Sequence, residues 1–289
     1  MILYTHPPSP HAGRGHGVSR SGRSGRSGHT DIQSLHPHQG AMIRDILQRK
    51  LRAPVQQLNM GGEYSLMYMV RRPGMQPRLI KVTTSADGER EAEILRHIMH
   101  APQIRSMCGV LDAKRYVPKL YSAGAIGKNI YFQVMEYIQG GETLTNLLQR
   151  AAAGRVPIQI LRRVHDHLHR AQQALYGLGV FHGDLHSSNV MIKNGDVYIL
   201  DYGFATFVPE LSKYACHPEN VPESVVYAMR RRHHQYGRQM MYDNRAMYAK
   251  HIGMLEAAIR RMDRPPGPRS SPVLKSVRRD IRVRPSPFG

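Results

Sequence analysis

Residues 182–205 read His-Gly-Asp-Leu-His-Ser-Ser-Asn-Val-Met-Ile-Lys-Asn-Gly-Asp-Val-Tyr-Ile-Leu-Asp-Tyr-Gly-Phe-Ala, with an aspartate on each side of a strand-like segment. Its middle part has the pattern of a β-hairpin turned by Asn194-Gly195, a dipeptide that readily supplies positive φ angles. A hairpin of this length can hold Asp184 and Asp201 at one end of the same sheet. Asn189 and Asp201 offer the oxygen ligands that Mg²⁺ prefers, which leaves Asp184 to accept a proton.

The order His-x-Asp-x-x-x-x-Asn followed by Asp-x-Gly resembles the catalytic loop and metal loop of the protein-kinase-like superfamily. The resemblance implies a bilobal α+β fold with a β-rich N-lobe and a reduced helical C-lobe. It also implies phosphoryl transfer from ATP with Mg²⁺ as cofactor, with Asp184 as the catalytic residue and Asn189 and Asp201 as metal ligands. The alternative is a β-hairpin with chance polar residues. The kinase interpretation therefore requires that the rest of the chain supply the other kinase motifs in the same order as in the family.

A lysine and a glutamate upstream match two of those parts. Lys81 ends a predicted strand between aliphatic residues, and a lysine pointing inward needs a countercharge because an unpaired buried ammonium is costly. The run Arg-Glu-Ala-Glu-Ile-Leu-Arg at residues 90–96 resembles the kinase helix that presents this countercharge from Glu91. The resemblance implies that Glu91 steadies Lys81 on the α- and β-phosphates. A surface lysine beside a solvated glutamate-rich helix is the alternative.

The glycine-rich loop of kinases has a degenerate counterpart here. Residues 60–65 read Met-Gly-Gly-Glu-Tyr-Ser, and only Gly62 falls in the kinase register. Backbone amides around Gly62 can still cover the phosphates of ATP, but we expect weakened nucleotide binding.

Residues 131–144 resemble the last N-lobe strand and the interlobe hinge of protein kinases almost residue for residue. They read Tyr-Phe-Gln-Val-Met-Glu-Tyr-Ile-Gln-Gly-Gly-Glu-Thr-Leu. The resemblance implies that backbone groups of Glu136 and Ile138 pair with the adenine edge. It further implies that Met135 controls the pocket behind the adenine and that Glu142 accepts a hydrogen bond from a ribose hydroxyl.

Apolar residues three and four positions apart predict a long amphipathic helix over residues 157–179, with a glycine near its end as C-cap. It leads directly into the catalytic loop, as the central C-lobe helix of kinases does. His165 and His169 lie one turn apart on it, but without a third ligand we expect surface histidines. After residue 205 too few residues remain for the full helical subdomain with which conventional protein kinases grip peptides.

Two departures from the kinase pattern bear on the subtype. Gly183 replaces the arginine of His-Arg-Asp, which implies that no activation-loop phosphate is needed, and His186 replaces a lysine near the transferred phosphate. His-Gly-Asp-Leu-His is typical of aminoglycoside and choline kinase relatives, and His-Gly-Asp also occurs in compact atypical protein kinases and small kinases of large DNA viruses. We expect an active atypical Ser/Thr protein kinase. The alternatives are a small-molecule phosphotransferase and a nucleotide-binding pseudokinase scaffold.

Composition divides the chain into three parts. Residues 1–40 are rich in Gly, Ser and Arg, and residues 264–289 in Pro, Arg and Ser, so both are predicted to be disordered tails. The kinase-like domain is predicted over residues 41–263, with an N-lobe at 41–135, a hinge at 136–142 and a C-lobe at 143–263. Apolar residues at helical spacing over residues 41–51 predict a helix docked on the N-lobe.

Charge and cysteine content bear on partners and location. The formal net charge of +20 favours acidic partners, so we expect an acidic protein substrate and weak nucleic-acid contact through the basic tails. Cys108 and Cys216 have no Cys-x-x-Cys spacing, and we expect ordinary packing residues in a reducing compartment rather than a disulfide framework or zinc site. No apolar run is long enough to span a bilayer, so a soluble intracellular protein of cytoplasm or nucleus is expected.

Overall fold

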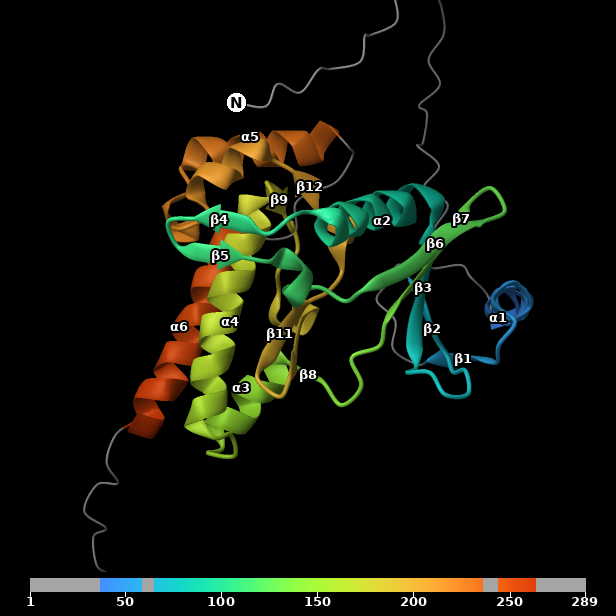
Figure 1. Cartoon of the computed structure of the whole chain (residues 1–289), viewed down its shortest axis with the longest axis horizontal. Helices are drawn as coiled ribbons and strands as arrows, with labels where there is room; N and C mark the ends of the chain where they lie inside the picture. The colour runs from blue at the N-terminus through green and yellow to red at the C-terminus, as the bar shows by residue number, and fades with distance from the viewer. Residues whose placement is uncertain (1–36, 59–64, 236–243, 264–289) are drawn as a thin grey trace, which may run out of the picture. The chain divides into compact units, whose positions relative to one another are not determined.

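A computed structural model describes residues 37–58, 65–235 and 244–263, and Figure 1 shows its elements. The helices are α1 (Pro37–Leu51), α2 (Ser85–His100), α3 (Leu144–Ala152), α4 (Ile158–Gly177), α5 (Glu223–Gln235) and α6 (Asn244–Asp263). The first strands are β1 (Val55–Leu58), β2 (Leu66–Val70), β3 (Arg78–Thr84), β4 (Ile104–Ser106), β5 (Gly109–Leu111), β6 (Leu120–Ile126) and β7 (Ile130–Glu136). Later strands are β8 (Glu142–Thr143), β9 (Val180–Phe181), β10 (Val190–Lys193), β11 (Asp196–Ile199) and β12 (Thr206–Phe207).

The N-lobe is a five-stranded antiparallel sheet in the order β1-β2-β3-β7-β6. Side chains alternate between its faces, as the two-residue period of a strand requires. One face carries Ile80, Val82 and Val134, which pack with Ile43 and Leu47 of α1 into a separate hydrophobic core. The predicted docked helix is therefore present, and it begins at Pro37, upstream of the predicted domain boundary.

Helix α2 packs against the same sheet at β3, β6 and β7. It follows β3 without a connecting loop, because Thr84 ends the strand and caps the helix by accepting a hydrogen bond from the amide of Asp87 at 3.4 Å. Buried apolar residues of α2, including Ile94 and Ile98, join the C-lobe core. The helix therefore links the N-lobe sheet to the C-lobe core.

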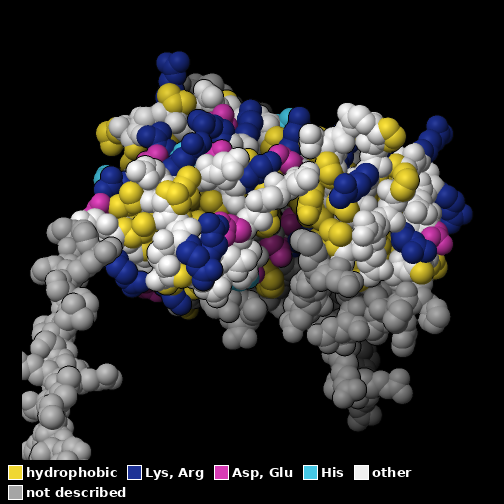
Figure 2. Space-filling view, turned by 90° about the horizontal axis from the view of Figure 1, so that it is seen from below, with side chains coloured by type: hydrophobic (Ala, Val, Ile, Leu, Met, Phe, Trp, Pro, Cys, Tyr) yellow, Lys and Arg dark blue, Asp and Glu magenta, His cyan; other side chains and the backbone are white. Residues whose placement is uncertain are grey.

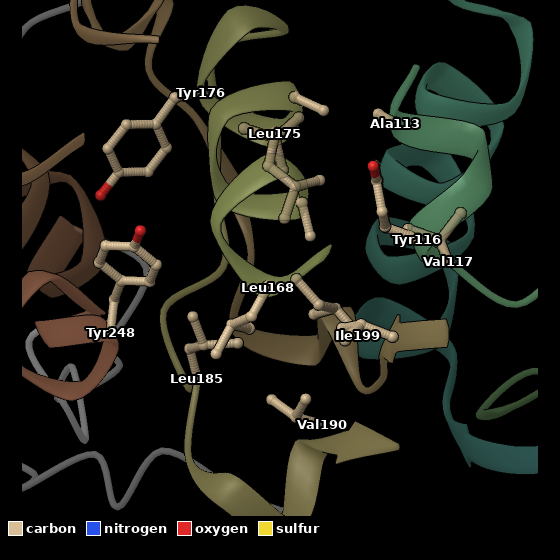
Figure 3. Close-up of a cluster of buried hydrophobic side chains, with 14 of the residues drawn as sticks. Ala113, Tyr116, Val117, Leu168, Leu175, Tyr176, Leu185, Val190, Ile199 and Tyr248 are labelled. Carbon is tan, nitrogen blue, oxygen red and sulfur yellow. The ribbon is translucent and has the colours of Figure 1, made fainter. Parts of the chain in front are cut away.

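The C-lobe is built around α4, whose buried stripe includes Leu161, Val164, Leu168 and Leu175. Figure 3 shows Leu168 and Leu175 of this helix among the buried side chains of Val117 and Ile199. The helix predicted within residues 157–179 is confirmed, since α4 ends at Gly177 and Gly179 turns the chain at φ 66°. Positive φ costs glycine little, which suits the residue to a helix C-terminus.

The predicted hairpin of residues 182–205 is confirmed as β10 and β11. The strands pair antiparallel from Val190 with Ile199 to Lys193 with Asp196. Asn194 and Gly195 have φ angles of 53° and 85°, as a two-residue primed turn requires. Residues 182–189 thus lead into this hairpin on one side, and the chain leaves it at Leu200 and Asp201 on the other.

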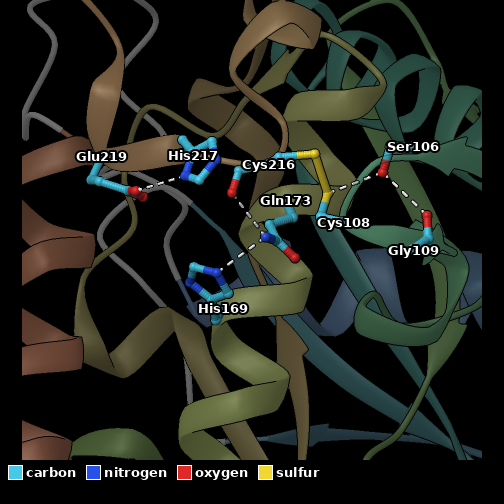
Figure 4. Close-up of a disulfide and its surroundings, with 8 residues drawn as sticks. All are labelled: Ser106, Cys108, Gly109, His169, Gln173, Cys216, His217 and Glu219. Atoms are coloured by element: carbon cyan, nitrogen blue, oxygen red, sulfur yellow. Dashed lines mark hydrogen bonds and ion pairs between the residues drawn. A yellow bond between two sulfur atoms is a disulfide. The ribbon is translucent and has the colours of Figure 1, made fainter.

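The expectation that Cys108 and Cys216 are unpaired packing residues is wrong. They form a disulfide with Cα atoms 5.4 Å apart, which joins the β4–β5 turn to the segment before α5 (Figure 4). The Nε2 of Gln173 on α4 donates to the carbonyl of Cys216 at 3.2 Å, which further fixes this segment. The partners are 108 residues apart, so only the fold brings them together, and the cysteines lend no support to a reducing compartment.

His169 of α4 has hydrogen-bond partners in the C-lobe. His169 hydrogen-bonds to Tyr248 of α6, and its Nε2 lies 3.1 Å from Nε2 of Gln173. Across the described ranges, His, Cys, Asp and Glu side chains form no group of three or more suited to a metal ion.

Within those same ranges, none of the helices combines the length and apolar character that a membrane crossing requires.

Candidate active site

Lys81 and Glu91 form a buried ion pair between β3 and α2. The Nζ of Lys81 lies 3.0 Å from Oε1 and 2.9 Å from Oε2 of Glu91, and the two side chains are 8% and 3% exposed. Buried charges persist only when they are paired and hydrogen-bonded. The pairing predicted from the sequence is therefore confirmed, while the contact of Lys81 with phosphates stays a prediction.

Asp201 brings the metal loop to the same ammonium group. Its Oδ1 lies 2.8 Å from Nζ of Lys81 and accepts a hydrogen bond from the amide of Gly203 at 3.3 Å. Asp201 has φ 62° and ψ 78°, a left-handed conformation that is uncommon outside glycine and clusters at functional sites. The next amide, that of Tyr202, donates to Oε1 of Glu91 at 3.1 Å. The loop is thus fixed to both members of the ion pair.

These contacts move the pKa values of the charged groups in opposite directions. Burial alone would lower the pKa of Lys81, but the charges of Glu91 and Asp201 outweigh it and raise that pKa above its usual value. Burial would raise the pKa of Asp201, but the charge and hydrogen bond of Lys81 lower it. Lys81 is therefore positively charged and Asp201 negatively charged at neutral pH.

Asp184 and Asn189 form the second part of the site. The Nδ2 of Asn189 donates to the backbone carbonyl of Asp184 at 2.9 Å and to its Oδ2 at 3.2 Å. The Nε2 of His186 lies 3.6 Å from the same Oδ2. The Oδ1 of Asp184 is buried and has no hydrogen-bond partner in the part of the chain that the structure describes. An acceptor oxygen in this state is suited to receive a hydroxyl proton.

Burial is the main reason that the pKa of Asp184 lies above its usual range, and the negative charge of Asp201 adds to it. His186 and the hydrogen bond from Asn189 act in the opposite direction. A carboxylate with a raised pKa is a better base than a solvated aspartate. The pKa of Asp184 is thus raised, whereas that of Asp201 is lowered.

His182 is a buried residue of the catalytic loop that was not among the predicted site residues. It is 1% exposed, its Nε2 donates to the carbonyl of Leu200 at 2.8 Å, and its Nδ1 accepts from the amide of Asp184 at 3.2 Å. Burial lowers its pKa to about 4, so the ring is neutral and joins the catalytic loop to the end of β11. Its place at the start of the His-x-Asp motif was the available signal.

The residues expected to bind Mg²⁺ fit that role. Because Nδ2 of Asn189 is turned toward Asp184, its carboxamide oxygen is the group left for a cation. The contacts of Lys81 and Gly203 both fall on Oδ1 of Asp201, whose side chain is 43% exposed. One carboxylate and one amide oxygen are a typical protein share for Mg²⁺, which otherwise keeps water and phosphate ligands.

The hinge residues are ordered, and their nucleotide contacts stay predictions. The amide of Glu136 donates to the carbonyl of Lys119 at 2.8 Å, and the carbonyl of Ile138 accepts from Gly141 at 3.1 Å. Met135 is buried and belongs to the C-lobe core. Glu142 forms an ion pair with Arg150 at 2.5 Å, so a ribose hydroxyl would compete with this arginine. Gly62 lies outside the described residues.

The structure explains why a glycine occupies position 183, which the sequence alone did not show. Its φ is 82°, and a Cβ at this position would overlap the carbonyl oxygen of Phe204 in the metal loop. Only glycine combines the positive φ with this close approach. The absence of the arginine typical of protein kinases is thus imposed by the packing of two loops.

Comparison with known proteins agrees with this geometry. A family model described as protein kinase domain matches residues 75–239, more than half of the chain, and the chain belongs to this family. The CBL-interacting serine/threonine-protein kinase 18 of Arabidopsis thaliana is 30% identical over 142 residues, which cover 48% of this chain and 24% of that protein. The cAMP-dependent protein kinase type 3 of Saccharomyces cerevisiae is 27% identical over 134 residues, covering 46% and 32%.

The chain matches less than a third of the length of these two curated relatives. Among solved structures, the Cydia pomonella granulovirus kinase PK-1 is similar with a TM-score of 0.44 and 15% identity, covering 58% of this chain and 60% of that one. The chain has the bilobal α+β fold of protein kinases, with the sheet of the N-lobe and the helices of the C-lobe meeting at Lys81, Glu91 and Asp201.

Proposed function

We propose that the chain is an active, atypical Ser/Thr protein kinase that transfers the γ-phosphate of ATP to a protein hydroxyl. The observation that carries this proposal is the arrangement of Lys81, Glu91 and Asp201, in which the ammonium group of Lys81 lies 2.8–3.0 Å from carboxylate oxygens of both acidic residues. A scaffold without catalytic activity has no need of this buried ion-pair arrangement. It also has no need of the Oδ1 of Asp184, which lacks a hydrogen-bond partner among the described residues.

Each residue then has a definite task. Lys81, held by Glu91, binds the α- and β-phosphates, and Asn189 with Asp201 supplies protein oxygens to Mg²⁺. Mg²⁺, when bound, neutralises charge that develops on the phosphate oxygens. The Oδ1 of Asp184 orients the acceptor hydroxyl and takes its proton. Positioning and charge neutralisation account for most of the rate in phosphoryl transfer.

The acceptor is proposed to be an acidic protein segment. The chain as a whole carries a formal charge of +20, and Figure 2 shows Lys and Arg side chains spread over one face, with Asp and Glu side chains interspersed among them. Small-molecule kinases that act on cationic sugars need acidic pockets, which a basic chain is poorly suited to provide. The charge therefore favours a protein acceptor and strongly salt-dependent binding.

Purified protein with Mg²⁺ and γ-labelled ATP tests the proposal against acidic proteins, basic proteins and small alcohols. Label on protein Ser or Thr, lost in the Asp184→Asn variant, is the expected result. Label on small alcohols alone would establish a small-molecule phosphotransferase instead. No label on any acceptor would leave a nucleotide-binding scaffold, and equal labelling by wild type and Asp184→Asn would refute the mechanism.

A further inference from the structure

Gln133 is a buried polar residue on β7 that lies directly opposite Lys81 in the pairing with β3. Its neighbours along the strand, Phe132 and Val134, are apolar and buried, and Gln133 itself is 0% exposed. An amide in such surroundings must find hydrogen-bond partners. Its partners identify what it does.

The side-chain nitrogen of Gln133 binds helix α2 at two points. Nε2 donates to Oε2 of Glu91 at 3.0 Å and to the backbone carbonyl of Gly88, one turn earlier, at 3.2 Å. Both partners are acceptors, so only the amide nitrogen can face them, which settles the orientation of the side chain. Each N–H of the amide group thus holds one point of the helix that carries Glu91.

The other end of the same amide has no compensation. Oε1 of Gln133 is buried without a hydrogen-bond partner in the described part of the chain, and such a group costs free energy. An apolar side chain of similar size would fill this position without that cost. Stability alone therefore does not account for a glutamine here, whereas the two hydrogen bonds to α2 do.

Gly88 makes the contact possible. A Cβ at this position would lie 2.7 Å from Cβ of Tyr131 and 2.9 Å from Cγ2 of Thr83. The helix thus approaches the sheet closely at Gly88, which brings both its carbonyl and Glu91 within reach of Gln133. The direct junction of β3 and α2 at Thr84 is a second attachment of the helix to the sheet. Together, this junction and the contacts of Gln133 fix the helix beside Lys81.

We infer that Gln133 is a positioning residue, which fixes the carboxylate of Glu91 on Lys81 so that the ion pair is assembled before nucleotide binds. This inference rests on the proposed kinase activity. The carboxylate of Glu91 contacts Nζ of Lys81 through both oxygens. Its Oε2 also accepts a hydrogen bond from Gln133, and its Oε1 accepts one from the amide of Tyr202. Gln133 is the member of this set that is neither charged nor part of the loops that bind metal or acceptor.

The test compares Gln133→Leu with wild type for kcat/KM of ATP, the dissociation constant of Mg²⁺-ATP and the melting temperature. Loss of a hydrogen bond to a charged group, and the misplacement that follows, is expected to lower kcat/KM by about 10- to 100-fold. The melting temperature should stay within about 4 °C of wild type, because the unpartnered oxygen is removed as well. Gln172→Leu is the matched control, since Gln172 of α4 is 1% exposed and its Oε1 also lacks a partner among the described residues; its kcat/KM should be unchanged.

A second variant, Gln133→Glu, gives a readout that a purely structural role would not move. Its carboxyl can donate to Glu91 only when protonated, so activity relative to wild type should rise as the pH falls from 8 to 6. Unchanged kcat/KM in Gln133→Leu, or parallel loss of activity and melting temperature in both Leu variants, would overturn the inference. Should wild type transfer no phosphate at all, the proposed function fails, and equal Mg²⁺-ATP dissociation constants for wild type and Gln133→Leu would separately overturn the role of Gln133.

Discussion

Removal of the Cys108–Cys216 disulfide is expected to destabilise the folded chain substantially. The two cysteines are 108 residues apart, and closing a loop of about 100 residues removes denatured-state entropy equivalent to about 4.7 kcal/mol at 25 °C in the chain-entropy description. Native disulfides are typically worth about 2–5 kcal/mol. We therefore expect the free energy of unfolding to fall by an amount in that range when both cysteines are replaced by serine.

Urea unfolding followed by tyrosine fluorescence suits the measurement, because the chain has 15 tyrosines and no tryptophan. The Cys108→Ser/Cys216→Ser double variant should lose as much stability as wild type treated with a dithiol reductant, and the reductant should have no further effect on it. A double variant that keeps the wild-type free energy of unfolding to within about 1 kcal/mol would contradict the entropy argument. Two free thiols in the untreated folded protein would contradict the pairing itself.

Three further predictions concern the active site and two buried histidines, His182 and His251 of α6, each of which is 1% exposed. Asp184→Asn should lower kcat by about 10²- to 10⁴-fold, the usual contribution of a general base, while isothermal titration shows an ATP dissociation constant close to wild type. Lys81→Met should weaken both ATP binding and turnover and lower the free energy of unfolding by about 3–5 kcal/mol, because Glu91 is left buried without its cation. Acid should destabilise the fold through His182 and His251, since burial lowers the pKa of each to about 4 while the unfolded value is about 6.5. The stability that these neutral rings contribute is fully present above pH 6.5 and is lost as the pH falls toward 4. The urea midpoint should therefore drop by an amount equivalent to about 1.6 kcal/mol per histidine between pH 6.5 and 5, and a flat profile over that interval would contradict the burial of both rings.

Sequence reasoning was sufficient where a local rule fixes the structure. Asn194-Gly195 dictates a tight hairpin turn, and the apolar spacing of residues 157–179 dictates a helix. The need of Lys81 for a countercharge is also a local requirement, because a buried ammonium must be paired, while the choice of Glu91 as its partner rested on the resemblance to the kinase helix. These features needed no knowledge of distant contacts.

Features that depend on distant contacts were missed. Nothing in the spacing of Cys108 and Cys216 indicates that β4–β5 and the segment before α5 meet, and nothing in the sequence of β7 shows that Gln133 reaches Glu91. The ion pair between Glu142 and Arg150 was also not anticipated, and the ribose contact of Glu142 stays a prediction. Tertiary proximity decided each of these outcomes.

The overlap that forbids a side chain at Gly183 also limits how this kinase can change in evolution. An arginine there would have to displace the carbonyl of Phe204, and with it the short loop that begins at Asp201. A single substitution therefore cannot restore the arginine that receives an activation-loop phosphate in regulated kinases. The catalytic loop and the metal loop would therefore have to change together before a side chain could be accommodated at position 183.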